Sequence, residues 1–76
     1  MKIYKPVPGD LLMFIDEGSY AQWFWGKIGE LQNIRTNSAG VDYCRVSWLN
    51  PVLYFGKYTS VSSFKLSNFE VYKSGK

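Results

Sequence analysis

One stretch near the middle of the chain, residues 25–51, constrains the fold more than any other. Its second half, residues 41–49, alternates apolar and polar side chains with a period of two, which is typical of a strand that buries one face. A polar segment, residues 36–40, comes directly before it and is rich in residues that favour turns. The stretch therefore predicts a β-hairpin, and no amphipathic helix of useful length is found elsewhere in the sequence.

The first strand of this hairpin is expected over residues 24–34 and has an irregular pattern. Phe24 and Ile28 share one face under strict alternation, whereas Leu31 falls on the other. A bulge at residues 29–30 would restore the phase, because one extra residue shifts the alternation and glycine tolerates the geometry. The pattern therefore predicts a strongly bent strand, as a small barrel requires.

The rest of the chain predicts shorter elements separated by turns. Asn50-Pro51 is expected to end the strand at 41–49, because proline cannot donate to the hydrogen-bond ladder. The other expectations, in chain order, are a short edge strand at 1–5, a buried strand at 11–15, a loop at 16–23, a β-prone segment at 52–58 with a bend at Gly56, a turn at Ser60, Ser62 and Ser63, a helical or 3₁₀ turn at 64–68 and a last strand at 69–72.

This order of elements is the layout of an SH3-like barrel. With 76 residues the chain has room for one domain. We therefore expect an all-β SH3-like barrel of about five antiparallel strands over residues 1–76, with a short 3₁₀ or helical turn before the last strand and a frayed tail at 73–76. The residues expected in its core are Leu12, Phe14, Phe24, Ile28, Leu31, Cys44, Val46, Trp48, Phe69 and Val71.

The chain carries fourteen aromatic residues, more rings than so small a core is expected to hold. Some rings should therefore lie at the surface, where an aromatic cluster indicates a contact site. Period two at residues 23–25 would place Phe24 inside and both Trp23 and Trp25 outside. The alternative is that two or three of the rings simply complete the core.

The candidate partner-binding residues combine these surplus rings with nearby cations. In an SH3-like barrel the long first loop commonly approaches the segment before the last strand. Tyr20 and Trp23 are therefore expected to meet Tyr54 or Tyr58 across an aromatic groove with a basic rim. The candidate residues are Tyr20, Trp23, Trp25, Tyr54, Tyr58, Lys27, Arg45 and Lys57.

Three kinds of partner suit such a groove. Protein recognition is favoured, because Tyr, Trp and Arg are common interface anchors and the net charge is only +3. Single-stranded nucleic acid is the alternative, with bases stacked on rings and cations along the phosphates, although Asp16 and Glu17 beside the aromatic segment would repel phosphates. Self-association through exposed rings or strand edges is a third possibility.

Catalysis is not expected from this sequence, and neither is a cofactor or a metal. The chain has no histidine, the commonest general base, and the serines at 60–63 therefore lack a candidate base. The glycine pair Gly26 and Gly29 lacks the helix that a phosphate-binding loop requires. With one cysteine, Cys44, and no histidine, the chain lacks the ligand set of a structural zinc site. Cys44 is expected to behave as a small buried hydrophobe, and a reactive thiol is the alternative.

The compartment expected from these features is the cytoplasm. A lone cysteine in an apolar strand fits a reducing environment. The apolar run at 11–15 is five residues long, far short of a membrane-spanning helix or the core of a signal peptide, so no membrane association is expected.

Four short segments resemble the small SH3-like barrel proteins of tailed phages, including those of cyanobacterial phages. These segments are Pro8-Gly9-Asp10-Leu11-Leu12, Gly26-Lys27-Ile28-Gly29, Arg45-Val46-Ser47-Trp48-Leu49 and Asn68-Phe69-Glu70-Val71. The resemblance covers nearly the whole chain and implies a phage-encoded protein of the host cytoplasm, in a family mostly without assigned function.

A more distant similarity is to the stromal photosystem I reaction-centre subunit IV, which is itself a five-stranded SH3-like barrel. It rests on Glu17-Gly18-Ser19-Tyr20 and on residues 64–71. The chain departs from that family by a longer aromatic loop and by Trp48. This similarity implies a docking role toward ferredoxin and neighbouring subunits.

Overall fold

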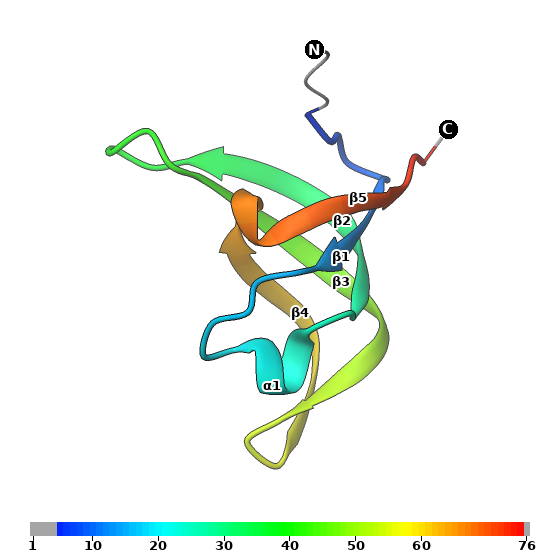
Figure 1. Cartoon of the computed structure of the whole chain (residues 1–76). Coiled ribbons are helices and arrows are strands. Elements are labelled where there is room, and N and C mark those ends of the chain that lie inside the picture. The colour runs from blue at the N-terminus through cyan, green and yellow to red at the C-terminus, as the bar shows by residue number, and fades with distance from the viewer. Residues whose placement is uncertain (1–4, 76) are drawn as a thin grey trace.

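The computed structural model describes residues 5–75 and shows an all-β protein. Five strands form one open antiparallel sheet in the order β4-β3-β2-β1-β5 (Figure 1), so the predicted all-β class is confirmed and the arrangement is that of a small barrel. The elements are β1 (Leu11–Phe14), α1 (Ala21–Phe24), β2 (Ile28–Thr36), β3 (Asp42–Tyr54), β4 (Lys57–Lys65), the 3₁₀ turn η1 (Leu66–Asn68) and β5 (Phe69–Lys73).

The hairpin of β2 and β3 is the long curved element of Figure 1. Its turn forms where the sequence predicts it, because the Asn37 side chain organises the local backbone. The Oδ1 atom of Asn37 accepts the backbone N–H groups of Ala39 at 2.9 Å and Val41 at 3.0 Å. Gly40 then takes a positive φ of 81°, which glycine adopts without a steric penalty.

The bend of β2 has a different origin from the predicted one. The register with β3 shifts between Leu31 and Asn33, so the irregularity lies beyond the predicted site at residues 29–30. Gly29 instead allows close packing against β3. A Cβ atom built on it would lie 3.1 Å from Cε3 of Trp48 and 3.1 Å from Cβ of Val46.

The predicted start of β2 at Phe24 is wrong, because residues 21–24 form a single helical turn. Backbone bonds from Phe24 N–H to the Tyr20 carbonyl and from Trp25 N–H to the Ala21 carbonyl, both 3.0 Å, close this turn. The period-two argument for residues 23–25 therefore does not apply. Trp23 is half-buried and packs against the core, and Trp25 is exposed.

The predicted end of β3 at Asn50-Pro51 is also wrong. The strand continues to Tyr54, and its register with β4 shifts between Ser47 and Val52. Pro51 lies inside this irregular stretch, where a missing N–H is tolerated. Tertiary packing thus carries β3 past a residue that stops a regular strand, and it buries Val52, which the sequence does not predict.

The serine-rich turn predicted at residues 60–63 does not exist, since these residues belong to β4. The hairpin between β3 and β4 turns instead at Phe55 and Gly56, whose φ angles are 49° and 77°. Two successive residues with positive φ are typical of the two-residue turns that match strand twist. Ser62 then faces inward, where its Oγ accepts the indole N–H of Trp48 at 2.9 Å.

The core lies on the concave side of the sheet. All predicted core residues except Ile28 and Val71 are buried, and those two are half-buried. Phe24 stacks on Trp48 with a ring-centroid distance of 5.3 Å, so the helical turn supplies a central core ring.

Buried Asp10 joins the two ends of the described chain. Its carboxylate accepts the N–H of Val7 at 3.0 Å and that of Gly75 at 2.9 Å. In the tail, Lys73 ends β5 and the N–H of Gly75 donates to Asp10, while the fraying expected from residue 73 stays a prediction. The edge strand predicted at 1–5 lies outside the described residues apart from Lys5, which is in no strand. Within residues 5–75, no helix has the length and apolar character needed to cross a membrane.

Candidate functional site

Four rings from two distant segments gather beside α1 and are called the aromatic surface here: Tyr20, Trp23, Tyr54 and Phe55. The centroid of Trp23 lies 4.9 Å from that of Tyr54 and 4.7 Å from that of Phe55. Tyr54 and Phe55 are 4.6 Å apart, and Tyr20 lies 6.1 Å from Tyr54. The rings therefore form one continuous cluster rather than isolated surface residues.

Phe24 attaches the aromatic surface to the core. Tyr20 and Phe24 lie four residues apart, so the helical turn presents them on one side. The ring of buried Phe24 lies 5.3 Å from Tyr54 on one side and 5.3 Å from Trp48 on the other. The outer rings are consequently packed against a buried core residue.

An open hollow of about 240 Å³ adjoins the aromatic surface, with Tyr20 and Tyr54 on one side and β4 on the other. Burial raises the pKa of Tyr54, and the neighbouring Tyr20 adds to this shift by electrostatic interaction and hydrogen bonding. The Tyr54 hydroxyl therefore stays protonated well into the alkaline range.

Phe55 is the unusual member of the cluster. Its φ of 49° lies in the left-handed region, which a bulky side chain rarely adopts. Its side chain is also 72% exposed, although it is fully apolar. Asparagine or glycine would satisfy this turn with less strain. The sequence prediction missed Phe55, and the Phe-Gly pair between two β-prone runs is the signal that could have located the turn.

The structure brings together part of the predicted aromatic set. Tyr20, Trp23 and Tyr54 meet as expected. Tyr58 pairs with Leu53 in the β3–β4 register and is 74% exposed, on the outward side of the hairpin. Trp25 follows α1 and is 54% exposed, and no ring contact of either residue occurs within the described part of the chain.

The three predicted cations occupy different places. Lys57 pairs with Tyr54 at the end of the β3–β4 hairpin. Lys27 lies between α1 and β2, and its carbonyl accepts the N–H of Phe14 at 2.9 Å. Arg45 lies on the outward face of β3, between Asn33 and Ser63 of the neighbouring strands. The register therefore places one of these cations, Lys57, directly beside a ring of the aromatic surface.

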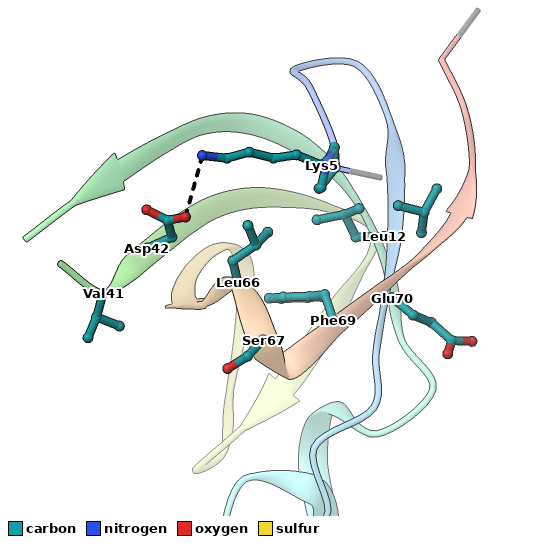
Figure 2. A pocket seen from close by; sticks show the side chains of 10 residues that line it. Lys5, Leu12, Val41, Asp42, Leu66, Ser67, Phe69 and Glu70 are labelled. Atoms are coloured by element: carbon teal, nitrogen blue, oxygen red, sulfur yellow. Dashed lines mark ion pairs between the residues drawn. The ribbon is translucent and has the colours of Figure 1, made fainter. Parts of the chain in front are cut away.

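A larger hollow of about 710 Å³ lies between the N-terminal segment, η1 and β5 (Figure 2). Two of its charged groups pair, because Lys5 Nζ lies 3.4 Å from Asp42 Oδ2. The Thr36 hydroxyl also donates to Asp42 Oδ1 at 2.5 Å, and it is the main cause that lowers the pKa of Asp42, followed by Lys5. Figure 2 shows Glu70 pointing away from Leu66 and Phe69. This hollow thus offers apolar walls and a paired ion, without a nucleophile and base in contact.

Cys44 is buried and free, as the sequence predicts. Burial raises the pKa of its thiol to about 11, so the reactive thiolate is scarce at neutral pH. Among residues 5–75, no group of three or more His, Cys, Asp or Glu side chains is arranged to hold a metal ion.

Comparison with known proteins yields no family model, no curated protein and no solved structure that matches this chain. The resemblances to phage barrels and to photosystem I subunit IV therefore stay predictions from sequence.

Proposed function

We propose that this protein is a non-enzymatic binding module that recognises a protein partner through the aromatic surface. The observation that carries the proposal is Phe55. Its backbone is held in a conformation that disfavours a bulky side chain, and its ring is left largely in water against Trp23. Strained, exposed residues of this kind concentrate at ligand-binding sites.

The surface suits an extended peptide segment. Its rings are tilted against one another, with interplanar angles of 84° between Trp23 and Tyr54 and 44° between Trp23 and Phe55. Such rings form ridges on which extended or proline-rich peptides pack. Lys57, which pairs with Tyr54 in the β3–β4 register, adds a cation at one edge.

The cellular setting of the proposal follows from sequence resemblance. A phage-encoded module acting in the cytoplasm of the host would meet host or phage proteins there. The partner we propose is an exposed segment of one of these proteins.

Selection from a displayed library of random peptides tests this proposal. The full chain serves as bait, and enriched peptides are then titrated against Phe55→Asn, Trp23→Ala and the control Tyr72→Asn, which alters an exposed ring on β5. We expect the first two variants to lose at least about tenfold in affinity and the control to stay within about twofold, since hot spots dominate such interfaces.

Three outcomes would contradict it. One is the absence of any enriched peptide, and another is an equal loss in Tyr72→Asn. The third is sedimentation of the chain alone as a dimer that Phe55→Asn dissolves, because the partner of the aromatic surface would then be a second copy.

A further inference from the structure

The outward face of β2, β3 and β4 gathers cations in two rows. In the first row the strand register places Arg35 opposite Tyr43 and Tyr43 opposite Lys65. Residues directly opposite each other on antiparallel strands share a face, so these side chains are neighbours. The second row, two residues along each strand, holds Asn33, Arg45 and Ser63.

These six residues are called the cationic face, and all six are exposed. Their strands turn the opposite side chains inward, because Cys44 and Val46 alternate with Tyr43 and Arg45 and are buried. A hollow of about 300 Å³ opens on this face, lined by Asn33, Arg35, Tyr43, Cys44, Arg45 and Ser63. The face is therefore a hollowed surface on which Arg35, Arg45 and Lys65 surround the ring of Tyr43.

No carboxylate lies in either row. Asp42 neighbours Tyr43 in sequence, but it alternates to the other side and is held by Thr36 and Lys5. Glu30 pairs with Ser47 beyond the second row and marks a boundary of the face. Positive charge is thus locally concentrated on a protein whose net charge is only +3.

We propose that the cationic face binds a single-stranded nucleic acid, with Arg35, Arg45 and Lys65 on successive phosphates and a base stacked on Tyr43. Arginine forks match phosphate oxygens with two hydrogen bonds. A tyrosine between cations provides the stacking platform that single-strand binders use. This face is separate from the aromatic surface and does not depend on the function proposed above.

The central tyrosine is also what favours an unpaired nucleic-acid strand over other polyanions. An acidic peptide would use the cations and gain little from the ring. A duplex presents its phosphates, but its bases are already stacked within the helix. A single strand uses both features, because every unpaired base exposes a π-face.

The test is fluorescence anisotropy with a labelled oligothymidylate of roughly 12 nucleotides, a length within the range of single-strand site sizes. The affinity is measured between about 50 and 200 mM NaCl for the full chain. We expect the logarithm of the association constant to fall with the logarithm of salt at a slope of about −2, since each neutralised phosphate of a single strand contributes about −0.7.

Two charge-matched variants locate the site. Arg35→Ala/Arg45→Ala/Lys65→Ala and Lys2→Ala/Lys73→Ala/Lys76→Ala each remove three positive charges and bring the net charge of +3 to zero. The first should lose at least about tenfold in affinity and most of its salt dependence, whereas the second should lose less than about threefold. Equal losses in the two variants would overturn the proposal, because attraction would then follow net charge alone.

Tyr43→Leu tests the stacking. We expect it to weaken binding at least about threefold with an unchanged salt slope. Unchanged affinity in Tyr43→Leu, together with equal competition by polyglutamate, would identify an acidic peptide as the occupant and overturn the proposal. Amide chemical shifts of the unmodified protein provide a readout that needs no variant: oligothymidylate should perturb Asn33 and Arg45, and perturbation confined to Trp23 and Phe55 would contradict the site.

Discussion

Two tryptophans, Trp48 and Trp23, show how this small domain uses its rings in two ways. Trp48 is 4% exposed, stacks on Phe24 and donates its indole N–H to Ser62. Trp23 is half-buried and rests against half-buried Tyr54 and exposed Phe55. A ring covered on all sides stabilises the fold, whereas a ring covered on one side leaves a surface that a partner can cover. Five predictions test this contrast.

The largest expected effect is at Trp48. Trp48→Ala should lower the free energy of unfolding by about 3–5 kcal/mol, because it opens a cavity beneath Phe24 and leaves Ser62 without its donor. That is comparable to the whole stability of many small domains. Urea denaturation followed by circular dichroism measures the loss. Trp48→Phe keeps a ring and should be clearly less damaging; a stable Trp48→Ala protein would show that this tryptophan is not a core residue.

Gly29→Ala tests the same region from the opposite strand. The added methyl would lie 3.1 Å from Trp48 Cε3 and 3.2 Å from the Ser47 carbonyl oxygen, so we expect a loss of about 1–3 kcal/mol from overpacking. The cost should shrink in a Trp48→Leu background, which removes part of the obstacle. An equal cost in both backgrounds would mean that Val46 and the backbone of β3, rather than the indole, set the limit.

Trp23→Ala should lower stability by about 1–2 kcal/mol, well below the loss at Trp48, since it removes ring contacts with Tyr54 and Phe55 at the surface. The variant should stay folded and lose affinity for peptides selected on the wild-type protein. Thermal unfolding and peptide titration measure the two effects. Unfolding of Trp23→Ala would assign this ring to the core and remove it from the proposed binding surface.

Phe55→Asn should leave the free energy of unfolding within about 1 kcal/mol of the wild-type value. Asparagine relieves the strain of the positive φ, while the ring contacts with Trp23 and Tyr54 are lost, and these terms oppose each other. Peptide affinity should nevertheless fall. A large loss of stability would indicate that Phe55 holds the hairpin in place, which would weaken the argument that its ring is retained for binding.

The smallest effect is expected at Cys44, on the buried side of β3. Burial raises the pKa of its thiol to about 11, above its value in an unfolded chain, so the unfolded chain loses this proton first as the pH increases. Its contribution to stability should therefore decline above about pH 9. A thiol reagent near pH 8 should react slowly with the native protein and rapidly in denaturant. Fast reaction with the native protein would show that the core does not cover this side of β3.

The secondary structure was predicted best where it depends on residues that are close together in the sequence. The alternation of Cys44, Val46 and Trp48 is a local property of one strand, and the Asn37 turn is closed by its own side chain. The prediction failed at residues 23–25, because three successive rings fit a strand and a helical turn equally well. Phe24 decides between them, since the helical turn is what brings its ring onto Trp48.

The candidate site was only partly predictable for the same reason. The sequence predicts that Tyr20 and Trp23 meet Tyr54 or Tyr58, and the structure shows them against Tyr54. Phe55 was missed and Tyr58 was misplaced, because the turn between β3 and β4 was expected among the serines. The strand register, which long-range pairing decides, sets which residues share a face.

By itself, then, the sequence determined an all-β chain with a buried face on β3 and a surplus of rings, because strand period, turn chemistry and ring volume are properties of short segments. Only the tertiary structure decided which aromatic rings stay outside the core. The strand order and register carry β3 past Pro51 to Tyr54, so that Phe55 in the following turn lies beside Trp23. They also align Arg35, Tyr43 and Lys65 on the outward face. These arrangements join residues far apart in the chain, so no local pattern encodes them.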